Sequence, residues 1–176
     1  MDKFKVYRLR EVEKKVVAAF EQSSIDELDP GEVTVRVAYS CVNYKDALAA
    51  TGAGRIIRRF PCVGGIDLSG TVVDSGHPRF RKRDAVIATS YDIGVAHDGG
   101  YGEYARVKAD WVVPMPKGMS FFDAMALGTA GFTAGLAVAR MEHEGLRPGN
   151  GPVAVTGATG VVGSIAIDIL AGLGHH

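Results

Sequence analysis

A glycine-rich loop near the C-terminus constrains the fold of this chain more than any other feature. The loop reads Thr156-Gly157-Ala158-Thr159-Gly160-Val161-Val162-Gly163. It follows the apolar strand pattern Val153–Thr156 and opens an apolar helix predicted from about Val161 to Leu173. Small residues let the backbone approach a pyrophosphate, and the free amides at a helix N-terminus attract that anion. This order favours a dinucleotide site over a tight connection without a ligand, with Gly163 allowing close packing of helix on strand.

The loop alone cannot complete a nucleotide-binding fold. One strand and one helix cannot form a doubly wound sheet, which needs several strand–helix units to bury both of its faces. The residue that reads the ribose usually lies ~20 positions beyond such a loop, and the sequence runs only to His176. We therefore interpret residues 151–176 as the start of a truncated Rossmann domain, and the chain as part of a longer protein.

The residues before Pro116 predict β structure. Strands are expected at Phe4–Leu9, Lys15–Phe20, Val33–Val42, Leu68–Val73, Ala85–Thr89, Tyr101–Val107 and Trp111–Val113. The stretch from Glu32 to Val37 is the clearest, because its valines lie on one face and its polar residues on the other. Short strands separated by turn residues favour a barrel or sandwich over a parallel sheet.

Beyond Pro116 the hydrophobic period becomes helical. Ser120 is predicted to cap a helix that begins at Phe121, and a break is expected at Gly128-Thr129-Ala130-Gly131. The predicted fold class is mainly β with an α/β end. The predicted domains are a β-barrel over 1–118, connecting helices over 119–150 and the Rossmann start over 151–176.

Composition narrows the function classes. Twenty basic and twenty acidic side chains give a formal net charge of zero, which argues against a general affinity for nucleic acid or for anionic membrane. No run approaches the ~18 apolar residues of a membrane span, and no signal sequence is recognised. The two cysteines, Cys41 and Cys62, form no disulfide framework. We therefore expect a cytoplasmic protein whose partner is a small-molecule substrate.

Several short motifs together resemble the zinc-independent medium-chain dehydrogenases/reductases, and among them the YhdH/YhfP group of quinone oxidoreductases and acrylyl-CoA reductases. The motifs are Asn43-Tyr44-Lys45-Asp46, Gly65-Ile66-Asp67, His77-Pro78-Arg79-Phe80, Gly128-Thr129-Ala130-Gly131-Phe132-Thr133-Ala134 and the glycine loop. The resemblance covers essentially the whole chain, which is about the N-terminal half of such a protein. It implies a GroES-like catalytic barrel and then a Rossmann domain, with NADPH (or NADH) as cofactor and a homodimer as the assembly.

Polar residues after the third predicted strand are the candidate catalytic groups. They are Asn43, Tyr44 and Asp46, joined by Asp67, a carboxylate in an apolar run. Asp67 is expected to hold Tyr44, Lys45 or an arginine, or to form a structural ion pair. By resemblance Tyr44 lies beside the nicotinamide ribose, the alternative being a tyrosine packed at the barrel edge.

The candidate cofactor-binding residues come from both halves of the chain. They are Tyr44, Thr129, Gly157, Thr159, Gly160, Val161, Val162 and Gly163. Thr129 lies in the predicted helix break, where small residues permit close approach of the backbone to a cofactor. The alternative for that break is a simple kink.

Zinc catalysis is not expected. By resemblance the zinc-ligand positions hold Asn43, Ile66 and Asp67, and neither of the first two supplies a thiolate or an imidazole. Cys41 lies two residues too early and is expected to pack as a small apolar group. Without zinc, hydrogen-bond donors must polarise the substrate while a nicotinamide supplies the reducing equivalents.

Two basic clusters are candidate anion sites. Arg55, Arg58 and Arg59 could meet the phosphates of CoA or NADPH. The second cluster, which is Arg79, Arg81, Lys82 and Arg83, is more typical of a solvated face. The family pattern has glycine where Arg83 stands, which implies strain or an altered turn if the backbone there has a positive φ.

The resemblance implies an NADPH-dependent oxidoreductase that reduces the C=C bond of acryloyl-CoA-like enoyl thioesters, or quinone and enone substrates. The 176 residues alone are expected to be inactive or nearly so. The first alternative is a non-catalytic GroES-like binding module, or a shortened protein made for folding studies. A zinc alcohol dehydrogenase is the least favoured interpretation.

Overall fold

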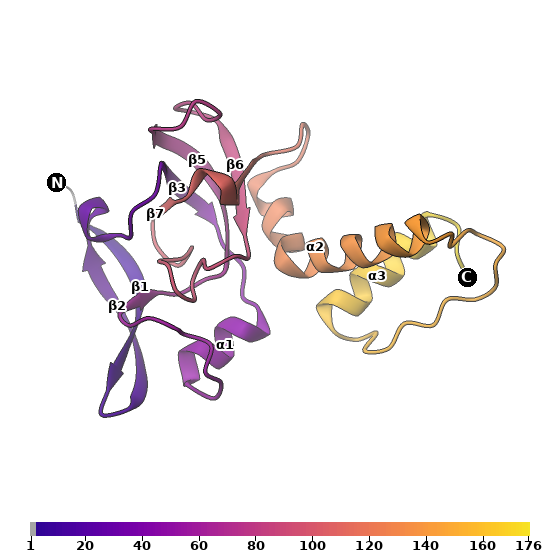
Figure 1. Ribbon diagram of the computed structural model, residues 1–176, viewed down its shortest axis with the longest axis horizontal. Coiled ribbons are helices and arrows are strands. Elements are labelled where there is room, and N and C mark those ends of the chain that lie inside the picture. Colours follow the sequence, from indigo (N-terminus) through magenta and orange to yellow (C-terminus); the bar gives the residue numbers. More distant parts are fainter. Residues whose placement is uncertain (1–2) are drawn as a thin grey trace. The chain divides into compact units, whose positions relative to one another are not determined.

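The computed structural model describes residues 3–176 and divides the chain into two compact units, Met1–Ala126 and Leu127–His176. Figure 1 shows the strands in the indigo to magenta part of the chain and the long helices in the orange and yellow part. The division falls inside the segment 119–150, which the sequence predicts as connecting helices.

The first unit contains two antiparallel sheets (Figure 1). The five-stranded sheet has the order β7-β3-β5-β6-β8, and the three-stranded sheet has the order β2-β1-β4. The strands are β1 (Phe4–Val12), β2 (Lys15–Ser23), β3 (Val33–Tyr39), β4 (Cys62–Val63), β5 (Asp67–Ser75), β6 (Ala85–Thr89), β7 (Tyr104–Val107) and β8 (Val112–Pro114). Every pairing is antiparallel, so the mainly β prediction is confirmed.

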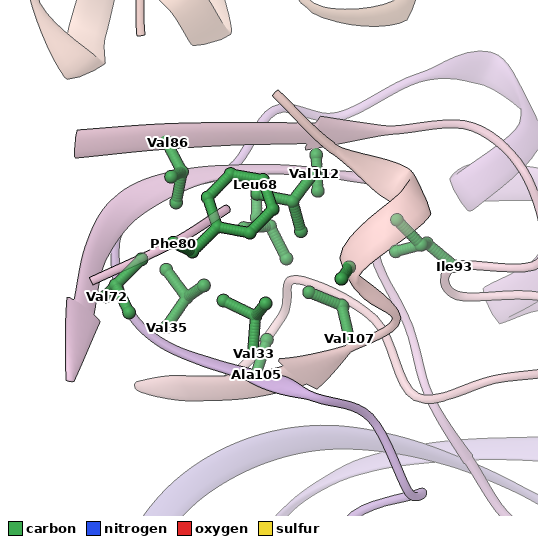
Figure 2. Close-up of a cluster of buried hydrophobic side chains, with 12 residues drawn as sticks. Val33, Val35, Leu68, Val72, Phe80, Val86, Ile93, Ala105, Val107 and Val112 are labelled. Atoms are coloured by element: carbon green, nitrogen blue, oxygen red, sulfur yellow. The ribbon is translucent and has the colours of Figure 1, made fainter. Parts of the chain in front are cut away.

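The core of the five-stranded sheet follows from the alternation in β3. Val33 and Val35 are fully buried and Arg36 is exposed, because successive side chains of a strand point to opposite faces. Figure 2 shows these valines packed against Leu68 and Phe80. A second cluster, made of Phe4, Val6, Leu28 and Val63, covers the three-stranded sheet.

The sequence prediction missed helix α1 (Tyr44–Thr51). The strand predicted to run to Val42 ends at Tyr39, and the strand predicted from Tyr101 begins at Tyr104. The signals for α1 were present, because an N-cap residue three positions before an acidic residue and a glycine after the last turn are typical helix ends. The two single-turn 3₁₀ helices are Ile25–Glu27 and Ala109–Trp111.

Helix α2 (Phe121–His143) begins and breaks where the sequence predicts. The Ser120 hydroxyl accepts a hydrogen bond from the Asp123 amide at 3.1 Å and donates one to the Asp123 carboxylate at 2.6 Å. At Gly128 the backbone leaves the helical region, with φ 48° and ψ −152°. The predicted cap and the predicted break are both confirmed.

The length and mean hydropathy of α2 make it long and apolar enough to cross a membrane, which the sequence analysis did not expect. Its most apolar window has a mean hydropathy of 1.4 and is 28% buried. A span needs ~20 continuous helical residues, and Gly128 divides α2 into two shorter segments. Core helices of water-soluble proteins meet the same criterion, so length and composition alone are weak grounds for a span.

In the second unit, α3 (Val161–Gly172) follows the glycine loop as predicted, but the strand predicted at Val153–Thr156 is not formed. An extended segment becomes a strand only when neighbouring backbone completes its hydrogen bonds. Within residues 3–176 no sheet includes this segment, and the Val153 amide donates instead to the carbonyl of His176 at 2.6 Å.

The turn before β6 places Arg83 in a backbone conformation that favours the glycine of the family pattern. Arg83 has φ 82°, in the region that favours glycine. We expect Arg83→Gly to raise the free energy of unfolding by about 1 kcal/mol, because glycine adopts this φ without a Cβ clash. Urea denaturation measures the change.

Lys82→Gly is the matched control, because Lys82 is not among the residues with positive φ. Glycine at position 82 raises the conformational entropy of the unfolded chain without relieving strain in the folded one, so we expect a small fall in the free energy of unfolding. Equal effects of the two substitutions would contradict the assignment of strain to Arg83.

Candidate functional site

The N-terminus of α1 gathers three of the predicted catalytic residues. Asn43 is the N-cap of this helix, and its backbone N–H donates to Asp46 Oδ2 at 2.8 Å. Asp46 Oδ1 accepts from the Ile66 amide at 3.1 Å. Asp46 is buried, and burial raises the pKa of its carboxyl although these hydrogen bonds oppose the rise. Asp46 therefore joins the start of α1 to the segment that precedes β5.

Asp67, at the start of β5, is fully buried and holds the side chain of Asn43. Its Oδ2 accepts from Asn43 Nδ2 at 2.8 Å and from the Cys41 thiol at 2.8 Å. The sequence analysis predicted a partner for this carboxylate but named Tyr44, Lys45 or an arginine. Two of its partners are an amide and a thiol, and both donate hydrogen bonds to a carboxylate oxygen.

Cys41 does not pack as a small apolar group, which corrects the sequence prediction. Its thiol donates to Asp67 Oδ2, and Asn43 Nδ2 lies 3.5 Å from its sulfur. Burial, followed by the hydrogen bond and the charge of Asp67, raises the pKa of the Cys41 thiol to about 12. Cys41 is therefore a protonated hydrogen-bond donor at neutral pH.

Tyr101 and Ser40 belong to this network, and the sequence analysis assigned neither to the site. The Tyr101 hydroxyl donates to the Cys41 carbonyl at 3.0 Å, and the Ser40 hydroxyl donates to the Asp67 carbonyl at 2.6 Å. Burial, and next the charge of Asp46, raises the pKa of the Tyr101 phenol. A Cβ added at Gly65 would lie 2.8 Å from Tyr101 Cγ, so glycine at 65 makes room for this ring.

The sequence feature that could have placed Tyr101 in the site is the pair of glycine clusters Gly64-Gly65 and Gly99-Gly100. A Cβ at Gly99 would lie 2.6 Å from the Gly64 carbonyl oxygen, and one at Gly100 would lie 3.0 Å from the Leu68 side chain. Paired glycines of this kind mark the close approach of two backbones. They predict that Tyr101 lies near Gly65.

Tyr44 stands outside the hydrogen-bonded network. Its side chain is on the first turn of α1, and the residue is 81% exposed. The alternative of a tyrosine packed at the barrel edge is therefore wrong. An exposed ring at this position is free to contact a ligand.

The first basic cluster is less available to phosphates than the sequence suggested. Arg58 forms an ion pair with Asp92, and Arg59 forms one with Asp29. Within residues 3–176 no ion pair is found for Arg55. A phosphate at Arg58 or Arg59 would have to compete with a carboxylate for its guanidinium.

Residues 3–176 contain no group of three or more histidine, cysteine, aspartate or glutamate side chains placed to hold a metal ion. The network at α1 contains Cys41, Asp46 and Asp67, but its hydrogen bonds are made with protein groups.

In the second unit, the glycine loop makes a tight turn into the N-terminus of α3. Gly157 has φ 65°, and Gly160 is the N-cap of α3. A Cβ added at Gly163 would lie 2.8 Å from the Gly157 carbonyl carbon and 3.0 Å from the Ala158 Cα, so the helix lies against its own loop only because residue 163 is glycine. The first-turn amides of Val161 and Val162 have no carbonyl of their own helix to bind.

Thr129 lies directly after the helical break at Gly128. Its carbonyl accepts from the Thr133 hydroxyl at 2.7 Å, so the helix resumes at once beyond the break. The structure confirms the break, and a contact between Thr129 and a cofactor stays a prediction.

The protonated state of Cys41 is testable by alkylation in a Cys62→Ala background. A thiol pKa of about 12 against ~8.5 for a free cysteine predicts that the folded chain reacts at least about a hundredfold more slowly with iodoacetamide at pH 8 than the chain in urea. Asp67→Asn removes the neighbouring carboxylate, which should lower the pKa of the Cys41 thiol. The alkylation rate of the folded variant should therefore begin to rise at a lower pH than the rate of the folded protein with Asp67. Mass spectrometry measures the rates, and equal rates for folded and unfolded wild-type protein would contradict the prediction.

Comparison with known proteins agrees with this architecture. The chain is 52% identical over 162 residues to the acrylyl-CoA reductase AcuI of Ruegeria pomeroyi, covering 92% of this chain and 49% of that protein. The structure of the yhdH oxidoreductase from Salmonella enterica in complex with NADP has a TM-score of 0.95 at 47% identity, covering 98% of this chain and 53% of that one. The Bacillus subtilis protein yhfP with NAD bound has a TM-score of 0.96 at 47% identity, covering 99% and 53% respectively.

The chain spans about half the length of these relatives. Residues 29–117 match the family model of the alcohol dehydrogenase GroES-like domain. This match covers the segment that contains β3 to β8 together with Cys41, Asn43, Asp67 and Tyr101. The chain therefore belongs to the family of alcohol dehydrogenase GroES-like domains.

Proposed function

We propose that this chain is the N-terminal part of an NADPH-dependent reductase that reduces the C=C bond of acryloyl-CoA-like enoyl thioesters, with quinones and enones as the other substrate classes. The observation that carries the proposal is the Asn43 side-chain amide held by the buried Asp67. By the family resemblance, Asn43 stands where zinc-dependent relatives have a metal ligand. The identity of 52% to an acrylyl-CoA reductase supports the substrate class.

Asn43 supplies the donor that such a reaction needs. Reduction of an enoyl thioester at its β-carbon places negative charge on the thioester oxygen, and a preorganised N–H stabilises that charge. Of the two N–H groups of Asn43 Nδ2, one donates to Asp67 and the other has only the Cys41 sulfur, at 3.5 Å. Sulfur is a weak acceptor, so this second N–H can bind a substrate oxygen.

The glycine loop fits a dinucleotide. Gly157 has the positive φ of a tight turn, and Gly163 leaves no room for a Cβ against Gly157. The amides of the first turn of α3 would bind the pyrophosphate, together with the positive end of the helix dipole. When bound, the nicotinamide supplies the reducing equivalents. NADPH is favoured as the cofactor, and NADH is the second candidate because yhfP of Bacillus subtilis has NAD bound.

The compartment, the partners and the oligomeric state of the protein are part of the same proposal. Both cysteines are free thiols, which supports the reducing cytoplasm as its compartment. The balanced charge supports a small-molecule substrate rather than nucleic acid or membrane. By the family resemblance, the full-length protein is a homodimer.

The assay is NADPH oxidation by the full-length protein with acryloyl-CoA, with quinones and simple enones as comparison substrates. We expect turnover with acryloyl-CoA, unchanged by a metal chelator. No turnover with any of these substrates would reject the reductase and favour a binding module, whereas loss of activity on chelation would favour a zinc enzyme. The 176 residues alone should be inactive.

Asn43→Ser tests the donor. Serine is as good an N-cap as asparagine, so α1 should persist, but the N–H groups are lost. We expect kcat to fall by about a hundredfold, which is the usual effect of removing one oxyanion donor. The thermal midpoint is the control for folding, and an unchanged kcat would remove Asn43 from the mechanism.

Gly163→Ala tests the glycine loop. The added methyl group would meet Gly157 and Ala158, so we expect NADPH to bind the full-length protein at least about tenfold more weakly, or ~1.4 kcal/mol. The matched control is Gly172→Ala in the same helix, where a Cβ meets nothing within 4 Å. That control should leave binding unchanged and favour helix formation. Nucleotide fluorescence measures both, and equal affinities would contradict the assignment of the loop.

A further inference from the structure

The mechanism above makes no use of the Cys41 thiol, although it lies in the same network. Residues 40–43 link β3 to α1, and Asn43 at the end of this link has an extended backbone. Because side chains alternate along an extended chain, Cys41 and Asn43 point to the same side, and both reach Asp67. Val42, between them, is 80% exposed. The link therefore presents two donors to one carboxylate.

Both donors bind the same oxygen. Asp67 Oδ2 accepts from Cys41 Sγ and from Asn43 Nδ2, each at 2.8 Å. The carboxylate holds the Asn43 side-chain amide, and the thiol is one of the groups that orient Oδ2. Losing the thiol would let the carboxylate rotate and carry the amide with it.

Two hydroxyl groups hold the main chain of Cys41 and of Asp67 independently of the contact between the thiol and the carboxylate. The Tyr101 hydroxyl donates to the Cys41 carbonyl at 3.0 Å, and the Ser40 hydroxyl donates to the Asp67 carbonyl at 2.6 Å. The Tyr101 ring in turn lies against Gly65, at a position that a side chain would fill. Cys41 is thus held at both its backbone and its side chain.

The thiol is suited to donating a hydrogen bond and unsuited to nucleophilic attack. Burial and Asp67 raise its pKa to about 12, so it stays protonated throughout the neutral range. The sulfur of Cys62, the other cysteine, lies instead 3.4 Å from the carbonyl oxygens of Val63 and His97.

We propose that Cys41 is a positioning residue, whose thiol holds Asp67 Oδ2 in the orientation that presents the Asn43 amide to the substrate. The catalytic consequence rests on the proposed reductase function, whereas the positioning itself does not. Cys41 contacts neither the substrate nor the cofactor in this role.

The kinetic test uses the full-length protein with NADPH and acryloyl-CoA. We expect Cys41→Ala and the bulkier Cys41→Val to lower kcat about tenfold, the effect of about one lost hydrogen bond to a charged group, with KM changed less than about twofold. Cys41→Ser keeps an O–H donor and should restore most of kcat. Cys62→Ala is the matched control and should leave kcat unchanged. Equal kcat values for wild type, Cys41→Ala and Cys41→Val would overturn the catalytic role.

The second test needs no activity and uses the 176-residue chain. The side-chain amide resonances of Asn43, assigned by their loss in Asn43→Ser, should move in Cys41→Ala and Cys41→Val and stay near the wild-type position in Cys41→Ser. Cys62→Ala should leave them unchanged. Asn43 side-chain amide resonances that stay at the wild-type position in every Cys41 variant would overturn the positioning role of Cys41. If the wild-type enzyme reduces no substrate, the proposed function fails while this measurement still decides the role of Cys41.

Discussion

The burial of one carboxylate organises the first unit of this protein. Asp67 is fully buried at the start of β5, and a buried carboxylate is tolerated only with hydrogen-bond donors around it. The chain supplies two of them from the link between β3 and α1, the Cys41 thiol and the Asn43 amide. That requirement fixes the path of the link and the position where α1 begins. The site is thus a consequence of satisfying Asp67 rather than a separate addition to the sheets.

Small residues make this burial sterically possible. Gly65 stands two positions before Asp67, and its missing side chain gives space to the Tyr101 ring, whose hydroxyl reaches the Cys41 carbonyl. Gly100 approaches the backbone of Asp67 itself, where a Cβ could not fit. The same principle recurs in the second unit, where Gly163 lies against the turn at Gly157. Close backbone approach, once for a carboxylate network and once for a predicted pyrophosphate site, explains why residues 65, 100 and 163 are glycine.

The sequence predicted those features that depend on local pattern. The valine alternation in β3, the Ser120 cap and the break at Gly128 follow from period and residue type, and all were confirmed. The strand at Val153–Thr156 failed because a strand depends on its neighbours, which no local pattern reveals. Cys41 was misjudged for a related reason, since its partner Asp67 is distant in sequence. Candidate site residues were found by type, but their pairing required the fold.

The chemistry of the network also bears on the choice of substrate. Reducing a ketone to an alcohol develops localised alkoxide charge, which zinc-dependent enzymes stabilise with a dication. The network here offers neutral donors beside the carboxylates of Asp46 and Asp67, and burial raises the pKa of Asp46. Hydrogen bonds from neutral groups stabilise a delocalised anion more readily than a localised one beside carboxylates. The enolate of a thioester and the anion of a reduced quinone are both delocalised. Under the proposed function, this arrangement of neutral donors supports conjugate reduction rather than alcohol chemistry.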